Sequence, residues 1–365
     1  MNITLMNCSN ECGNCETGEV IPLAVRISPI LLMVALIHCC IVIVLGSLGN
    51  GVALWCVVRC PNTMPAVKVL LCSVFAPLLV ICLVTRPAVA HIITAIITCN
   101  PANFFTKFRV VTTLVYSSLA GLELVAIAAV AFFRMLAVCG RGRHSMSTTV
   151  AVVIVVSMSV YSVVTSVGLL GSVVLRWVWE PYLKRVIFIV YFFLITMLPI
   201  LVTGASYAYI IFTVQENKRR LARSQQSCLR VHNAVDQATR AMLAVFISNL
   251  LFGLPHAVYH LLHEPSFTLN VVFHIIFSTH FVVDPVVFVW YNQSYRRRVG
   301  ELACSGLTWM MQCCTTRNSP TTNQSSSCTK ESICNTEASS STKESSFLKK
   351  SSCTKESSST TESRP

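Results

Sequence analysis

The acidic residue Asp284 lies inside a long apolar stretch and is followed directly by Pro285. An acidic group in hydrocarbon is costly unless neighbouring groups satisfy it, and a proline leaves a backbone carbonyl without its helical partner. An ionisable residue in such a stretch therefore marks a functional site by default. The next segment carries Arg296, Arg297 and Arg298 opposite an apolar face, as in a helix that lies on an anionic membrane surface.

Three histidines, His256, His260 and His263, are spaced so that they share one face of a helix. Imidazole titrates near physiological pH and commonly binds zinc, so this face could bind zinc or sense pH. No nearby thiol completes a tetrahedral set, although Glu264 could assist. We therefore favour a role in lining a ligand pocket and expect no metal site. No nucleophile and base pair points to catalysis, so we expect a protein that is not an enzyme.

The elements that carry these residues are expected to be membrane helices. Of the 365 residues, 54% are hydrophobic and only 12% are charged, and the mean hydropathy is +0.65, which excludes one or two soluble domains. A membrane helix needs about 20 mostly apolar residues. Seven runs of this kind are present, at about residues 27–58, 65–96, 105–139, 147–175, 184–213, 238–263 and 268–292.

The chain divides into four segments. Residues 1–26 form an extracellular N-terminal segment, residues 27–292 the seven-helix bundle, residues 293–304 a short amphipathic eighth helix, and residues 305–365 a cytoplasmic tail. The tail is rich in Ser and Thr and poor in large apolar residues, so we expect it to be disordered. A repeated Thr-Lys-Glu-Ser unit within the tail offers clustered phosphorylation sites or is low-complexity drift.

Charges in the short loops predict the orientation of the chain. Lys and Arg are more numerous on the side of the spans that holds Arg59 and Lys68, and such residues concentrate in cytoplasmic loops. This bias places the N-terminus outside and the C-terminus inside. The net charge of +13 is then mostly an inner-leaflet feature that faces membrane lipids, and nucleic acid is not an expected partner.

Two kinds of covalent modification fit this orientation. Asn2 and Asn7 begin glycosylation sequons, which are useful on an extracellular segment. Cys304, Cys313 and Cys314 lie just past the seventh span, where acyl chains would add membrane anchorage, so we take them as candidates for palmitoylation.

Short motifs occur in a fixed order along the spans. They are Gly49-Asn50 in the first span, an Arg-Met-Leu-Ala-Val-Cys stretch from Arg134 in the third, Pro199 and Tyr207 in the fifth, Pro255 in the sixth, and Asp284-Pro285-x-x-Phe288 in the seventh, followed by Tyr295-Arg296. In this order and spacing the chain resembles the rhodopsin-like family of G-protein-coupled receptors over about residues 27–304.

This resemblance implies an all-α, seven-transmembrane helix bundle at the plasma membrane. It also implies a receptor that passes the binding of an unknown extracellular ligand to a heterotrimeric G protein through Arg134, Tyr207 and Phe288. Receptor kinases and arrestin would then act on the tail. The seventh span contains no Lys to hold retinal, which argues against an opsin.

Several positions depart from the pattern of the family. Phe133 replaces the acidic neighbour of Arg134, Asn249 replaces a core phenylalanine, Gly253 replaces a tryptophan of the sixth span, and Phe288 replaces the tyrosine of the seventh. The resting state then has fewer restraints, so we expect raised basal signalling or altered coupling.

The resemblance also implies a polar core. The sodium-binding Asp that the family has in its second span is replaced by Pro77, whereas Glu123 occupies a third-span position beside the same pocket. If Glu123 and Asp284 face each other beside Asn50 and His280, they could hold Na⁺ with oxygen ligands or share one proton. Alternatively, Glu123 is simply protonated and hydrogen-bonded to a backbone carbonyl.

Basic residues are candidates for ligand binding. Arg86 and Arg109, which we expect near the extracellular ends of the second and third spans, could bind an anionic ligand beside His256 and His260. Alternatively, such arginines extend to lipid headgroups. Two other functions stay open: an atypical or decoy receptor that signals mainly through arrestin, and a membrane transporter, although the sequence shows no internal repeat.

Overall fold

The computed structural model describes residues 28–61, 63–98, 106–139, 146–174, 180–223, 229–260, 266–302 and 304. The chain divides into two units, Met1–Val299 and Gly300–Pro365, and only four residues of the second unit are described. The tail and the modification candidates Asn2, Asn7, Cys313 and Cys314 lie outside the described residues, whereas Cys304 is exposed.

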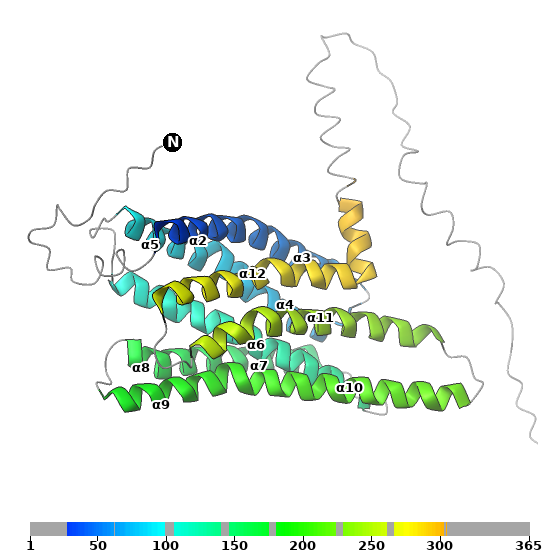
Figure 1. Cartoon of the computed structure of the whole chain (residues 1–365). Coiled ribbons are helices and arrows are strands. Elements are labelled where there is room, and N and C mark those ends of the chain that lie inside the picture. Colours follow the sequence, from blue (N-terminus) through cyan, green and yellow to red (C-terminus); the bar gives the residue numbers. More distant parts are fainter. Residues whose placement is uncertain are drawn as a thin grey trace, which may run out of the picture. The chain divides into compact units, whose positions relative to one another are not determined.

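Seven helical spans make up the described part of the first unit, which contains no strand (Figure 1). Four spans consist of two α-helices joined by a π-helical turn, and three are continuous. In chain order the spans are α2 (Pro29–Ile41) with α3 (Ser47–Arg59), α4 (Pro65–Val80) with α5 (Arg86–Ile97), α6 (Thr106–Cys139), α7 (Thr148–Thr165) with α8 (Gly171–Val174), α9 (Pro181–Phe192) with α10 (Leu198–Arg223), α11 (Leu229–Tyr259) and α12 (Phe267–Tyr291).

All seven spans are long and apolar enough to cross a membrane. The predicted all-α, seven-helix fold is therefore confirmed, and most span limits lie within a few residues of the predicted ones. The fifth span is longer than predicted at both ends: Pro181 begins it three residues earlier, in the first turn, where a missing N–H costs nothing, and α10 continues ten residues further to Arg223. Helix α11 begins at Leu229, nine residues before the predicted start of the sixth span. Helix α11 ends at Tyr259, so His263 and Glu264 lie outside the described residues.

Proline explains two of the four π-helical turns. The turn Ile81–Thr85 ends two residues before Pro87, and the turn Phe193–Met197 ends two residues before Pro199. A proline has no N–H to donate and its ring crowds the carbonyl four residues earlier, so the helix widens ahead of it. The widened turn of the second span changes the direction in which Arg86, the next residue, points.

Helix α6 is central to the bundle. It packs against α4, α7, α10 and α11, while α11 and α12 pack along each other and α12 also meets α3 (Figure 1). Buried apolar side chains from these helices form one main core, which includes Val57, Phe75, Ile127, Met242 and Phe281. The inward-facing positions of α6 and α12 are therefore shielded from lipid on every side.

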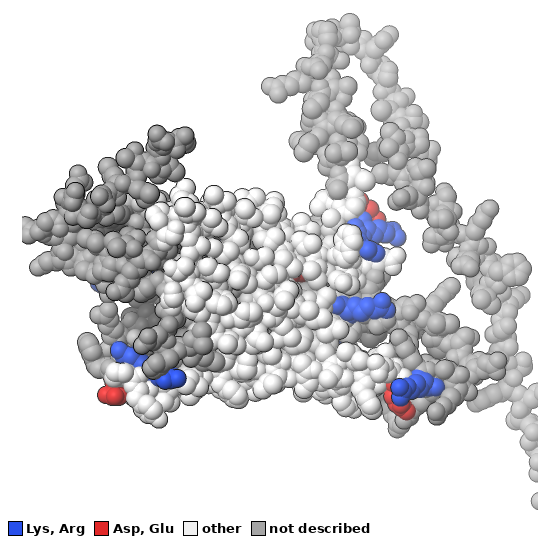
Figure 2. All heavy atoms as spheres, viewed as in Figure 1, with Lys and Arg blue, Asp and Glu red and all other residues white. Residues whose placement is uncertain are grey.

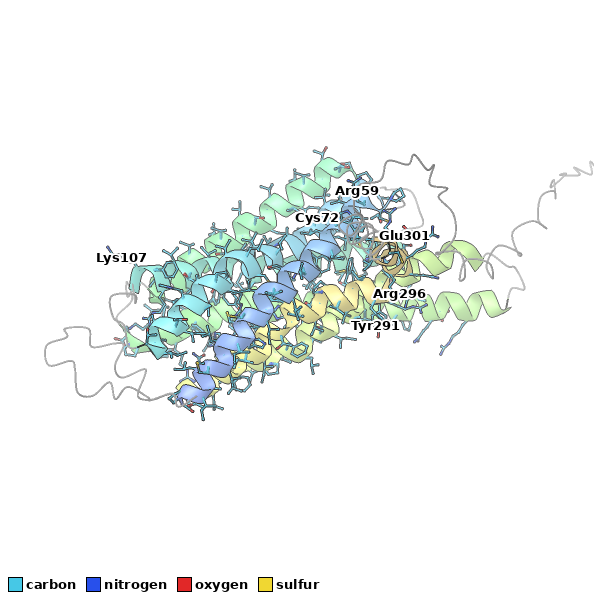
Figure 3. All side chains as sticks on the ribbon, turned by 90° about the horizontal axis from the view of Figure 1, so that it is seen from above. Arg59, Cys72, Lys107, Tyr291, Arg296 and Glu301 are labelled. Atoms are coloured by element: carbon cyan, nitrogen blue, oxygen red, sulfur yellow. The ribbon has the colours of Figure 1, made fainter. Side chains whose placement is uncertain are left out.

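Charged side chains avoid the middle of the bundle surface. On the face shown in Figure 2, nearly all visible Lys, Arg, Asp and Glu atoms lie toward the two ends of the helices, and the surface between them is almost free of charge. Lys107 lies at one end, and Arg59 and Arg296 lie at the other (Figure 3). Many large apolar side chains are exposed between these ends, as expected for a surface solvated by lipid tails. We refer below to the Lys107 end and the Arg59 end.

Glycines bring the first span close to its neighbours. A Cβ atom on Gly46 would lie 2.6 Å from Cys82 Sγ, and one on Gly49 would lie 2.9 Å from Pro285 Cγ. Real Cβ atoms do not make such short contacts, so both positions require glycine for this approach. The close packing places Asn50 of α3 against the proline-kinked part of α12.

Asn292 ends α12 and caps the helical segment 293–302. Its side-chain Oδ1 accepts hydrogen bonds from the backbone N–H groups of Ser294, at 3.1 Å, and Tyr295, at 3.3 Å. Tyr295 is buried against Phe288, with ring centroids 5.3 Å apart. This burial raises the pKa of the Tyr295 hydroxyl, which therefore stays protonated at physiological pH.

Candidate functional site

Two carboxyl groups meet at the centre of the bundle. Glu123 comes from α6 and Asp284 from α12, and both are almost fully buried. Asn249 of α11 joins them, because its Nδ2 donates to Asp284 Oδ2 at 2.6 Å and, weakly, to Glu123 Oε1 at 3.5 Å. His280 Nε2 lies 3.4 Å from Glu123 Oε2, and His280 Nδ1 donates to the Phe277 carbonyl. We call Glu123, Asn249, His280 and Asp284 the carboxylate centre.

Asn50 supports this centre from the first span. Its Nδ2 donates to the carbonyl of Phe281 at 2.9 Å and to that of Gly46 at 2.8 Å. The Phe281 carbonyl is the one that Pro285, four residues later, leaves without a helical donor. Asn50 therefore lies beside the acidic residues as expected, but its link to them is indirect. Its amide donates to the backbone carbonyl of α12 that Pro285, directly after Asp284, leaves without a donor.

The charges of the carboxylate centre require a further cation or proton. Two ionised carboxylates and one imidazolium leave one negative charge in a buried site, which is unfavourable. Asn50 Oδ1 and Asp284 Oδ1 are buried and have no hydrogen-bond partner among the described residues. Oxygen atoms of this kind suit Na⁺, and a proton on one carboxyl group would also neutralise the remaining negative charge. The donor set thus fits a hard cation, and His280 Nε2 would compete with that cation for the Glu123 carboxylate.

A small apolar cavity borders the carboxylate centre at Asn249. Its volume is about 10 Å³, which is close to the minimum for a single water molecule. It is too small for an organic ligand. The lining residues come from α6, α10 and α11 and are Leu124, Ile127, Pro199, Ile200, Thr203, Phe246, Asn249 and Leu250.

Arg86 is buried inside the bundle. Only 6% of its surface is exposed, and it lies eleven residues, or about 16 Å along a helix, before the end of α5 at Ile97. The expectation that Arg86 lies near the end of its span is therefore wrong, because the span continues for eleven residues after it. Its guanidinium donates to Tyr116 Oη at 3.2 Å and packs over the rings of Tyr116 and Phe281.

Arg109 lies apart from Arg86. It belongs to the first turn of α6, seven residues, or about 10 Å, before Tyr116, to which Arg86 is bonded. Its side chain is half-buried. The two arginines that we grouped as ligand candidates therefore lie at different depths of the bundle.

Three histidines gather where α11 ends and α12 begins. His256 and His260 face each other across one helical turn, with their Nε2 atoms 3.0 Å apart. The third is His274 of α12, whose ring centroid lies 4.6 Å from that of His256. The pairing of His256 with His260 agrees with their helical spacing, but the third member comes from another helix. Phe277 stacks on His256 at 4.4 Å, next to the position of Gly253.

The predicted coupling residues lie toward the Arg59 end. Arg134 interacts electrostatically with Tyr207 and Tyr295, and its Nε has no hydrogen-bond partner within the described part of the chain. Tyr207 stacks on Phe246, with centroids 5.8 Å apart. Phe288 packs between Phe75, at 4.5 Å, and Tyr295, at 5.3 Å. Tyr295 thus connects Phe288 to the surroundings of Arg134.

Sequence reasoning missed several members of these sites. Asn249 is recognisable in the sequence only as an unusual residue, because its bond to Asp284 joins two helices. Tyr116 and Phe277 look like ordinary apolar lining. His274 has one signal in the sequence, because a histidine in a membrane span is rare enough to examine. It lies four residues before Ser278 on the same span.

Comparison with solved structures supports the fold. The chain superimposes on the crystal structure of squid rhodopsin with a TM-score of 0.66 and 15% sequence identity, and the match covers 79% of this chain and 89% of squid rhodopsin. No protein-family model matches the sequence, and no curated protein sequence matches it either. At this identity the likeness concerns the fold alone. The chain is a multi-pass membrane protein with a rhodopsin-like seven-helix fold.

Proposed function

We propose that this protein is a receptor that activates a heterotrimeric G protein when a ligand binds from the extracellular side. The observation that carries the proposal is the arrangement at the Arg59 end, where Arg134 lies among Tyr207 and Tyr295 inside a rhodopsin-like bundle. A cation that lies near two tyrosines, with no hydrogen bond to its Nε among the described residues and no acidic neighbour in sequence, can change partners when the helix ends separate.

Raised basal activity follows from the same arrangement. Phe133 precedes Arg134 where a carboxylate would restrain the guanidinium, and Phe288 contributes only ring packing. Phe277 packs beside Gly253, so the sixth span carries no large side chain of its own there. With fewer polar restraints, the free-energy gap between resting and active states is smaller, and a larger fraction of molecules is active without ligand.

The ligand that we propose is anionic, and Arg86 is its anchor. A buried guanidinium is costly without an anionic partner, and Tyr116 supplies only a neutral hydroxyl. Arg86 Nε has no hydrogen-bond partner within the described residues. A carboxylate would form charge-assisted hydrogen bonds there. His256 and His260 lie where α11 ends, and His256 interacts electrostatically with Arg86.

The carboxylate centre is proposed to hold Na⁺ or one shared proton. Glu123, Asp284 and Asn50 would supply oxygen ligands to the cation, which balances the second carboxylate. We further propose a plasma-membrane location with the N-terminus outside, membrane lipids around the bundle, and action of receptor kinases and arrestin on the tail. Glycosylation at Asn2 and Asn7, and acylation at Cys304, Cys313 and Cys314, belong to the same proposal.

Expression of the full chain with biosensors for each class of Gα subunit tests the receptor function. We expect ligand-independent activation of at least one class, with a loss of tenfold or more in Arg134→Ala. Arg59→Ala is the matched control, because Arg59 is an exposed arginine at the same end of the bundle. Arrestin recruitment without any G-protein response would favour the atypical receptor, and sodium-driven solute uptake would favour a transporter.

Arg86 is tested separately with binding of small carboxylates to the purified protein. Arg86→Gln should abolish binding of a carboxylate that the wild-type protein binds, whereas Arg86→Lys should keep part of it, because a lysine retains the charge but loses the two-pronged hydrogen bonding. Equal binding by the wild-type protein and Arg86→Gln would contradict the anchor.

A further inference from the structure

The histidine triad His256, His260 and His274 has a geometry that the receptor function does not require. One ring nitrogen of each residue lies within 4.8 Å of those of the other two. His256 comes from α11, His260 follows directly after its last residue, and His274 comes from α12, so the triad lies at the contact between two helices. We propose that the triad binds one divalent transition-metal ion, with Zn²⁺ as the reference ion, and that the bound ion joins α11 to α12.

The hydrogen bond of His274 prepares it as a ligand. Its Nδ1 lies 2.9 Å from the carbonyl oxygen of Asn270. A carbonyl only accepts hydrogen bonds, so Nδ1 carries the proton and Nε2 keeps its lone pair. Metal-binding histidines are commonly oriented in this way by a carbonyl behind the ring. The backbone of α12 therefore fixes both the tautomer and the direction of the His274 ring.

The distances within the triad suit a tetrahedral ion. Zinc binds histidine nitrogen at about 2.0–2.1 Å, which places two ligand nitrogens of one ion about 3.3 Å apart. His256 Nε2 and His260 Nε2 are already 3.0 Å apart. A metal would take the place of the proton between them, and the ring that carried this proton would become the Nδ1–H tautomer, so that both rings stay neutral. A ring nitrogen of His274 lies within 4.8 Å of those of the other two histidines, so a small approach of α12 to α11 brings it to the same ion while the hydrogen bond to Asn270 is kept.

The donor type selects the class of ion. Three neutral imidazoles favour Zn²⁺, Cu²⁺ or Ni²⁺ over Ca²⁺ and Mg²⁺, which prefer oxygen. Three protein ligands leave a fourth position for water or an exogenous group. The triad differs from the histidine set that the sequence suggested, because His274 of α12 is its third member and His263 lies outside the described residues.

The surroundings favour a rigid triad but oppose high affinity. Phe277 stacks on His256, and the rings of Tyr259 and Phe188 lie 5.4 Å and 6.0 Å from that of His260. Arg86 is the charged group that acts on both His256 and His274, and its positive charge repels a cation. We therefore expect an anionic group, such as hydroxide or a carboxylate, in the fourth position.

Metal titration of the full chain in lipid nanodiscs tests the site. Thermal unfolding is measured with Zn²⁺ and with EDTA, and Co²⁺ replaces Zn²⁺ so that visible absorption reports the coordination. We expect a melting temperature that rises with Zn²⁺, binding of one ion per chain, and a four-coordinate Co²⁺ spectrum without a thiolate charge-transfer band. His274→Gln should weaken binding at least tenfold, and His256→Gln should do the same.

The controls separate the triad from other metal-binding groups. His91→Gln changes an exposed histidine on α5, packed only against Phe108 among the described rings, and should bind Zn²⁺ like the wild-type protein. The His274 and His256 variants should unfold like the wild-type protein in EDTA. A Zn²⁺ effect that persists in both variants, a thiolate signature with Co²⁺, or no Zn²⁺ effect on the wild-type protein would each overturn the proposal. None of these outcomes depends on G-protein coupling.

Discussion

Asn50 and Pro285 act as a pair at the scale of single residues. Pro285 lies inside α12 directly after Asp284 and has no N–H to donate to the Phe281 carbonyl, and the Asn50 amide on another span donates to that carbonyl at 2.9 Å. In a bundle surrounded by lipid, no water is available to replace this donor. The position of Asp284 in the carboxylate centre therefore depends on a residue whose side chain donates to backbone carbonyls and not to the Asp284 carboxyl group.

Asn50→Ala should lower the free energy of unfolding by about 1–3 kcal/mol, because it leaves buried carbonyls unsatisfied. Unfolding by SDS in mixed micelles measures this loss. In a Pro285→Ala background the restored N–H can serve the Phe281 carbonyl, so Asn50→Ala should cost less there. Thr94→Ala is the control, because the Thr94 hydroxyl is exposed and bonds only within its own helix. An equal cost in both backgrounds would contradict the pairing.

The balance of charge in the carboxylate centre gives a second prediction. The melting temperature of the wild-type protein should be higher in NaCl than in choline chloride at equal ionic strength, because Na⁺ stabilises the two facing carboxylates. Glu123→Gln should remove this difference, since one carboxylate no longer needs a balancing cation. If the two groups share a proton instead, the wild-type protein will show no sodium effect, and Glu123→Gln will change only the pH dependence of melting.

Some residues of the candidate sites could be predicted from the sequence and others could not. Glu123, His280 and Asp284 are recognisable because ionisable groups in apolar runs are rare and costly. Asn249 and His274 are harder to predict, since an amide or an imidazole on one helix acquires its role from the partner that packing brings from another. Arg86 was expected near the end of its span although the span continues to Ile97. Its inward direction follows the widened turn Ile81–Thr85, which has no direct sequence signal beyond Pro87.

At the scale of elements, small residues decide how closely the first span approaches its neighbours. Gly46 faces Cys82 and Gly49 faces Pro285, in both cases with no room for a side chain. Membrane helices often pack through such small residues, because lipid tails provide no hydrophobic drive to hold helices together. The approach of α3 to α12 is what allows Asn50 to reach the Phe281 carbonyl.

Alanine substitutions along α3 test this packing. Gly49→Ala should destabilise the protein by about 1–3 kcal/mol, because the added methyl group overlaps with Pro285. Gly51→Ala is a matched control two residues away, where a Cβ meets nothing within 4 Å. Gly51→Ala should be neutral or stabilising by about 0.5–1 kcal/mol, since alanine favours the helix. The same SDS unfolding assay applies, and equal effects of the two changes would contradict the close approach.

At the scale of the whole molecule, the seven spans could be predicted almost completely. Hydrocarbon requires every backbone group to be bonded within the chain, so apolar runs of sufficient length have one solution, the helix. The order of the helices around α6 and the partners of each polar residue could not be predicted in this way, because apolar side chains fit many helix arrangements. Part of that arrangement can be inferred from the positions of Pro87, Pro199 and Gly49.

The function proposed for the molecule joins two regions. Arg86 and the histidine triad lie on the side of the Lys107 end, and Arg134 lies toward the Arg59 end, with the carboxylate centre between them on α6 and α12. A ligand that shifts α11 against α12 would alter the Asn249 to Asp284 bond, which joins these two helices at 2.6 Å. This bond therefore provides a physical connection between the two regions of the bundle.

The most direct test of this account is nucleotide exchange on purified G proteins by the full chain in nanodiscs. We predict that the wild-type protein accelerates the exchange of GDP for GTP on at least one heterotrimer without added ligand, that Arg134→Ala reduces the rate tenfold or more, and that Arg59→Ala leaves it unchanged. A wild-type protein that accelerates exchange on no heterotrimer, or an Arg134→Ala variant as active as the wild type, would contradict the account.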